Sequence, residues 1–322
     1  MEKELIKVKK NKKNILNELV SDNSSILIFR EYRNYTKNDC MVARLSDFNM
    51  LEKYPVMEKR EIRDFLMTEN KNIFFNREEK SKVLKRFIKD FYPQYVGLNL
   101  RKDESINNDV VSNLIRYYDD LTMFGLGLDL SFIKASYTGP IQFNTSLSLN
   151  NIVLNDSVKY ALMGAYATAA TQRNEYYNLR YRHLKELDRS CILAPSTILA
   201  NKNSVANTAL YARFESNHKY FILRDIRHDF KLIPLKNPTL IESNLDYEID
   251  VTAAIKRIKR HDKYIDSVYI YESKDLRFFI KDDNGTESER MSFSDIIREH
   301  LPELNIIEID PDCSIFEGYY AE

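Results

Sequence analysis

The chain has 322 residues, with 48 basic and 48 acidic side chains and a formal net charge of +0. This balance excludes a global electrostatic attraction to nucleic acid or to an anionic membrane, so any such binding needs a local patch of charge. Hydrophobic residues make up 43% of the chain, which excludes intrinsic disorder and predicts a packed core. The chain length favours two domains, or one domain with an appendage.

Cysteine usage and apolar runs predict where the protein resides. The three cysteines are widely separated, and the longest apolar runs are far too short to span a bilayer. We therefore expect an intracellular, cytoplasmic protein without a disulfide framework or a membrane partner. Only 7 glycines are present, which disfavours phosphate-cradling loops. The lysine-, asparagine-, isoleucine- and tyrosine-rich composition is typical of A/T-rich coding and points to a viral, phage or mobile-element origin.

Hydrophobic periodicity predicts both helices and strands in the first 155 residues. The expected elements are an amphipathic helix over 1–20, a strand over 24–33 with 41–45 as its partner, and helices over 58–67, 77–92 and 105–124. Pro93 and Gly125 follow the last two helices, at positions where these residues end helices. Alternating apolar and polar residues after Pro140 predict a hairpin over 126–149 with its turn at 137–140.

The segment from Asp156 to Cys191 contains no proline and one glycine. Its helix-favouring composition and the cap residues at its start predict one long central helix over about 156–190. Small residues line the first half of this helix, which favours close packing against another helix or subunit. Tyrosine and arginine crowd its second half.

The last part of the chain predicts short strands with two helices. The expected elements are strands over 220–223 and 230–235, a helix over 250–260, a hairpin of 267–272 with 276–281, a helix over 292–301 and a strand over 306–309. The predicted fold class is therefore α+β, with mixed helices, mostly antiparallel hairpins and the long central helix. We expect an N-terminal α/β region (1–155), the long helix (156–195) and a C-terminal α+β region (196–322), with one compact unit as the alternative.

One pattern is compatible with metal-dependent nuclease chemistry. Glu272 and Lys274 have the E-x-K spacing at the end of an apolar strand, where a carboxylate can hold Mg²⁺ and a lysine can orient the attacking water. Asp310 is one candidate for the second carboxylate. The ordinary interpretation of the same residues is the turn of a polar hairpin. Histidines and cysteines show no ligand spacing, so no metal site and no cofactor is predicted.

Two clusters of basic or aromatic residues are candidate binding sites for nucleic acid or a protein partner. The first lies in the second half of the long helix and consists of Tyr176, Tyr177, Arg180, Tyr181 and Arg182. The second ends the helix over 250–260 and consists of Lys256, Arg257, Lys259 and Arg260. Such residues stack bases and hold phosphates, and they also form protein–protein hot spots. Packing within the chain, or cations that complement a helix dipole, are the alternatives.

Three functions follow from these observations. The missing catalytic motifs, the neutral charge and the long helix favour a non-catalytic interaction or assembly subunit of a larger complex, which self-associates or binds a protein partner. The alternative is a nucleic-acid-binding protein, including a Mg²⁺-dependent nuclease that uses Glu272 and Lys274. The third is a small-molecule enzyme whose active site has no local signature.

Overall fold

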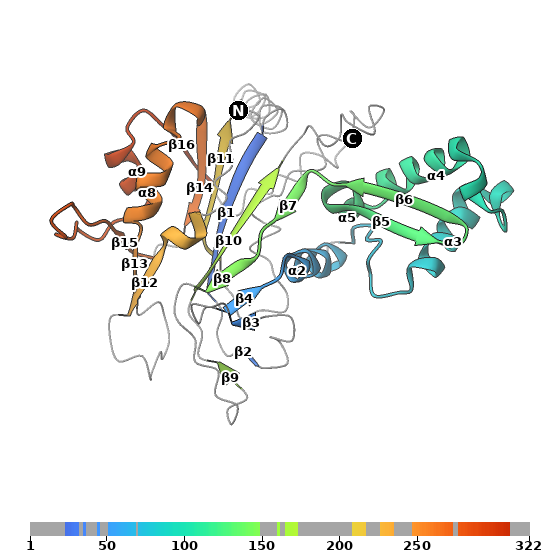
Figure 1. The fold of residues 1–322 in the computed structure, drawn as a ribbon, viewed down its shortest axis with the longest axis horizontal. Coiled ribbons are helices and arrows are strands. Elements are labelled where there is room, and N and C mark those ends of the chain that lie inside the picture. Colours follow the sequence, from blue (N-terminus) through green and yellow to red (C-terminus); the bar gives the residue numbers. More distant parts are fainter. Residues whose placement is uncertain are drawn as a thin grey trace, which may run out of the picture.

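The computed structural model of the protein describes residues 23–31, 35–36, 44–45, 51–68, 70–148, 160–161, 165–172, 208–216, 226–234, 247–272 and 276–309. Within these ranges the fold is α+β, and a nine-stranded sheet lies at its centre (Figure 1).

The central sheet is mostly antiparallel. Its strands are β1 (Asn23–Glu31), β3 (Arg44–Leu45), β4 (Leu51–Lys53), β7 (Ile141–Phe143), β8 (Ser146–Ser148), β10 (Ala165–Gln172), β11 (Thr208–Ser216), β14 (Ser267–Glu272) and β16 (Asn305–Glu308). They are ordered β16-β14-β11-β1-β10-β8-β4-β3, and β7 also pairs with β10. Only the β14–β16 pair of this sheet is parallel. The predicted strand over 24–33 is confirmed as β1, which lies between β10 and β11.

A C-terminal lobe covers one face of the central sheet. It consists of α8 (Thr252–Lys259), α9 (Phe293–His300), the 3₁₀ helices η4 (Ile226–Asp229) and η5 (Asp262–Tyr264), and a small sheet of β12 (Lys231–Pro234), β13 (Tyr247–Asp250) and β15 (Phe278–Phe279). Leu27 of β1 and Phe214 of β11 are fully buried in the core beneath this lobe, together with Ile258 and Phe293.

The opposite face of the central sheet packs against α2 (Pro55–Thr68). Because side chains alternate along a strand, Ile26 and Ile28 of β1 point away from Leu27 and reach this second core. Ile62 and Leu66 of α2 join them there. The central strand therefore supplies side chains to both cores.

Residues 70–138 form an insertion that has a core of its own. It contains α3 (Lys80–Phe91), η1 (Pro93–Tyr95), η2 (Leu100–Lys102), α4 (Glu104–Tyr117), α5 (Asp119–Phe124) and the hairpin of β5 (Gly125–Leu130) with β6 (Ile133–Thr138). Figure 1 shows the insertion on the side of the central sheet away from the C-terminal lobe. The predicted helix over 77–92 is confirmed as α3, and the stripe of Val83, Leu84, Phe87 and Ile88 is buried in the insertion core.

The prediction of one long central helix over 156–190 is wrong. Residues 160–161 form strand β9, which pairs with β2 (Tyr35–Thr36), and residues 165–172 form β10. All eight residues of β10 pair with β1, and β7 and β8 pair with its other edge. The helix preference of alanine over other ordinary residues is well under about 1 kcal/mol per residue, and pairing on both edges outweighs it. Residues 173–190 lie outside the described residues.

Two other expectations also need correction. The predicted helix over 105–124 is divided at Tyr118 into α4 and α5, and the N–H of Asp119 donates to the carbonyl of Asn72 at 3.0 Å. The predicted hairpin over 126–149 instead turns at 131–132, between β5 and β6, and the residues after Pro140 join the central sheet as β7 and β8. The predicted domain boundaries near 155 and 195 stay predictions.

Candidate nucleic-acid interface

Two cations of α2 lie one helical turn apart. Pro55 occupies the first turn, where its fixed φ suits a helix start and its missing N–H has no partner to lose. Ile62 and Leu66 bury the apolar face of the helix. Lys59 and Arg63 are spaced i and i+4, so their side chains lie on one face of α2.

The fully buried Asp120 of α5 fixes Arg63. Arg63 Nε donates to Asp120 Oδ2 at 2.8 Å, and the N–H groups of Phe74 and Phe75 donate to the same carboxylate at 2.8 and 3.3 Å. Burial raises the pKa of Asp120, while the Arg63 guanidinium and these two N–H groups act in the opposite direction. One carboxylate thus connects α2, the segment that follows it and α5.

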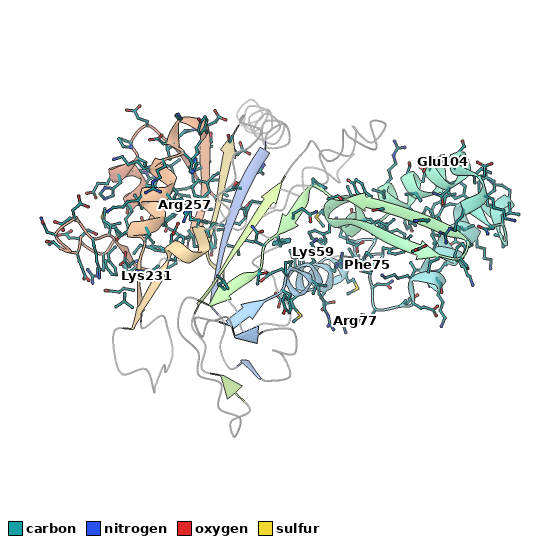
Figure 2. The ribbon with its side chains drawn as sticks, viewed as in Figure 1. Lys59, Phe75, Arg77, Glu104, Lys231 and Arg257 are labelled. Carbon is teal, nitrogen blue, oxygen red and sulfur yellow. The ribbon has the colours of Figure 1, made fainter. Side chains whose placement is uncertain are left out.

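Two cations lie over the ring of Phe75. The Arg63 guanidinium is 4.7 Å from the ring centroid and the Lys80 ammonium is 4.9 Å from it. Arg63 and Lys59 are also 5.3 and 5.7 Å from the ring centroid of Phe124. We call Lys59, Arg63, Phe75, Lys80 and Phe124 the α2 basic cluster. Figure 2 shows Lys59 and Phe75 beside α2, with Arg77 close by.

Keeping the ammonium group of Lys59 charged costs free energy, because the group is partly buried. Burial, and next the nearby Arg63 guanidinium, lower the pKa of Lys59 from its ordinary value of 10.5 to about 8. Because the folded protein binds this proton less tightly than the unfolded chain does, stability rises with pH between about 8 and 10.5. Below about pH 8 the full cost of the partly buried charge is present. An anion bound beside Lys59 would offset that cost.

The predicted basic cluster on α8 is partly neutralised. Arg257 donates to both carboxylate oxygens of Asp229, and Lys256 Nζ lies 3.2 Å from Asp283 Oδ1. Lys259 and Arg260 are exposed. Figure 2 shows Arg257 in the C-terminal lobe, on the other side of the central sheet from Lys59. The other predicted cluster, Tyr176, Tyr177, Arg180, Tyr181 and Arg182, lies outside the described residues.

The candidate catalytic residue Glu272 is the last residue of β14, and its carboxylate lies at the start of α9. Its carboxylate accepts from the N–H of Phe293 at 2.7 Å, from the N–H of Ser294 at 3.3 Å and from Ser294 Oγ at 2.5 Å. Lys274 and Asp310 lie outside the described residues. Within the described ranges, no three His, Cys, Asp or Glu side chains are grouped as a metal site would require.

The α2 basic cluster was missed by the sequence analysis. Its members come from α2, the following segment, α3 and α5, and no local pattern connects them. The only local signal is the i, i+4 spacing of Lys59 and Arg63, which is common on solvated helices.

Comparison with known proteins gives a fold but no family. No protein-family model matches the sequence, and no curated protein matches it. The structure is similar to a chain of a "CRISPR RNA-guided surveillance complex", with a TM-score of 0.51 and 9% identity over 90% of this chain and 97% of that chain. It is also similar to a chain of a "CRISPR RNA-guided surveillance complex, pre-nicking", with a TM-score of 0.50 and 7% identity over the same shares. At these identities the likeness shows a shared fold. Among the helices of the described residues, none has the length and apolar character needed to span a bilayer.

Proposed function

We propose that the protein is a nucleic-acid-associated assembly subunit of an RNA-guided complex. The observation that carries the proposal is the extent of the structural likeness, which covers 90% of this chain and 97% of a chain from a CRISPR RNA-guided surveillance complex. The likeness extends over nearly the whole of both chains, so it concerns the complete fold and not a local motif. We also propose that this subunit binds a protein partner or a second copy of the chain, and that it has a mobile-element origin.

The α2 basic cluster supports direct contact with nucleic acid. Proteins hold single strands with basic side chains that track the phosphates and with aromatic rings beside them. Lys59 and Lys80 would bind phosphate oxygens near the ring of Phe75, over which the Arg63 guanidinium and the Lys80 ammonium lie. A bound phosphate would also place a negative charge beside Lys59, whose charged form is disfavoured by burial.

The nuclease alternative stays a prediction with less support. The three hydrogen bonds that Glu272 accepts at the start of α9 give this carboxylate a structural role. A carboxylate that caps a helix in this way has fewer oxygen lone pairs left for a metal ion.

Lys59→Met tests the proposal because it should change stability and binding in opposite directions. The substitution removes a charge that is costly to bury, so the free energy of unfolding should increase at pH 7, and this gain should disappear above pH 10.5. Binding to a single-stranded RNA should weaken about 5-fold, because one contact to a charged phosphate is lost. The slope of log affinity against log salt should fall by about 0.7, the value for one phosphate on a single strand.

Lys231→Met is the matched control, since Lys231 is an exposed lysine of β12 on the other side of the molecule (Figure 2). It should change neither the affinity nor the salt slope. Fluorescence anisotropy with a labelled RNA measures both quantities, and urea unfolding measures the stability. Equal salt slopes for Lys59→Met and the unmodified protein would show that the α2 basic cluster does not touch phosphate.

A further inference from the structure

An open groove lies where α3 and α4 end. It has a volume of about 500 Å³ and is lined by Phe87, Phe91, Tyr92, Asn113, Arg116 and Tyr117. Phe91 and Tyr117 are the last residues of the two helices, and they remain 50% and 39% exposed. Their ring centroids are 4.9 Å apart at an interplanar angle of 61°. We call this site the aromatic groove.

We propose that the aromatic groove binds unpaired bases of a single-stranded nucleic acid. The proposal rests on the proposed function and names a second place on the same chain where the strand is held. Exposed aromatic rings next to basic side chains are the chemistry by which single strands are bound without sequence preference, because every base has a π-face.

The composition of the lining suits unpaired bases. Four of the six lining side chains are aromatic, one is an amide and one is a guanidinium, and bases stack on aromatic rings and on arginine guanidinium planes. The exposed aliphatic residues Val96 and Leu98 follow α3 but do not line the groove. Aromatic faces without aliphatic neighbours are suited to stacking.

The charge around the groove is complementary to a phosphate backbone. α3 carries five basic residues and one acidic residue, Asp90, in twelve positions. Lys89 of this helix is exposed and Arg116 lines the groove from α4, whereas Arg86 is paired with Glu78 at 2.9 Å. The carboxylate of Asp109 is near the groove as well, but it accepts from Asn113 Nδ2 at 3.3 Å. Arg116 in the lining and Lys89 in the last turn of α3 therefore place cations near the aromatic rings.

Two tyrosines and an amide hold one wall of the groove in place. Asn113 Nδ2 donates to the hydroxyl of Tyr92. The Tyr92 ring is stacked on Tyr95, with a centroid distance of 5.7 Å and an interplanar angle of 13°. Phe87 lies beneath Phe91, with centroids 4.8 Å apart, and is itself buried. The rings of Phe91 and Tyr117 are thus held by their neighbours while part of each side chain stays exposed.

The test separates stacking from simple apolar contact. Phe91→Leu and Tyr117→Leu keep an apolar side chain but remove the ring, and each should weaken binding to a labelled single-stranded RNA of adenines about 10-fold. Phe91→Trp keeps a ring and should preserve the affinity of the unmodified protein. The double variant Val96→Ala/Leu98→Ala is the matched control and should leave RNA affinity unchanged. Because the substituted side chains are partly exposed, all variants should unfold at nearly the denaturant concentration of the unmodified protein.

Three results would each contradict base binding at the aromatic groove. If the unmodified protein binds RNA and both leucine variants bind it equally well, the aromatic groove is not a base-binding site, while the proposed function stands. If the leucine variants and the Val96→Ala/Leu98→Ala variant all lose self-association but keep RNA affinity, the groove is a protein interface and the inference is overturned. If the unmodified protein binds no RNA, both proposals fail.

Discussion

Asp120→Ala is expected to lower the free energy of unfolding by about 3–5 kcal/mol, because it leaves a buried guanidinium without its carboxylate. The Arg63 side chain is 12% exposed and Asp120 is 0% exposed, so water cannot easily replace the lost partner. The N–H groups of Phe74 and Phe75 lose their acceptor in the same variant. Urea unfolding followed by circular dichroism measures the change.

Glu78→Ala is the control for this prediction. Glu78 pairs with Arg86 at 2.9 Å, but the two side chains are 48% and 56% exposed. Exposed pairs of this kind contribute at most about 1 kcal/mol. An Asp120→Ala variant that is no less stable than Glu78→Ala would contradict the role given to Asp120 as the connection between α2 and the insertion.

Gly125→Ala is expected to lower the free energy of unfolding by about 3 kcal/mol or more. Gly125 has φ +90°, which is unfavourable for any residue with a Cβ. An added Cβ would also lie 2.5 Å from the N atom of Gly139 and would overlap the carbonyl oxygen of Tyr137. At this point the chain passes from α5 into β5, close to where β6 leads back to the central sheet, so neither backbone can easily move.

Gly127→Ala is the matched control in the same strand. A Cβ at Gly127 would meet no atom within 4 Å, so this substitution should be neutral or should stabilise the protein slightly. Chemical unfolding of the two variants gives the comparison. Similar stabilities for the two would mean that the backbones of Gly125 and Gly139 are not in close contact.

Elements with a strong local pattern could be predicted from sequence. The strand over 24–33 and the helices over 58–67 and 77–92 were predicted within a few residues of β1, α2 and α3, because the two helices bury regular stripes and β1 is a short apolar run that is buried on both faces. The segment over 165–172 misled the prediction because its alanines favour a helix locally. Its strand conformation depends on pairing with β1, more than 130 residues earlier in the chain, which a local pattern cannot show.

The binding surfaces were harder to predict than the fold. Phe91 belongs to the apolar stripe of α3, and its exposure follows from its position at the end of the helix, beyond the insertion core. The cations of α8 could be listed from sequence, but their carboxylate partners Asp229 and Asp283 are brought in by folding. The same holds for Phe75, which meets Arg63 and Lys80 only in the folded chain.

Size-exclusion chromatography with light scattering, run on the freshly purified chain at about 50 and about 200 mM salt, tests the central claim most directly. A nucleic-acid-associated assembly subunit should elute at low salt as a species heavier than the 38.0 kDa chain, with the ultraviolet absorbance ratio of bound nucleic acid. The higher salt should remove much of that nucleic acid, because counterion release drives its binding. A 38.0 kDa monomer free of nucleic acid at both salt concentrations, which also fails to bind added RNA, would contradict the proposed function.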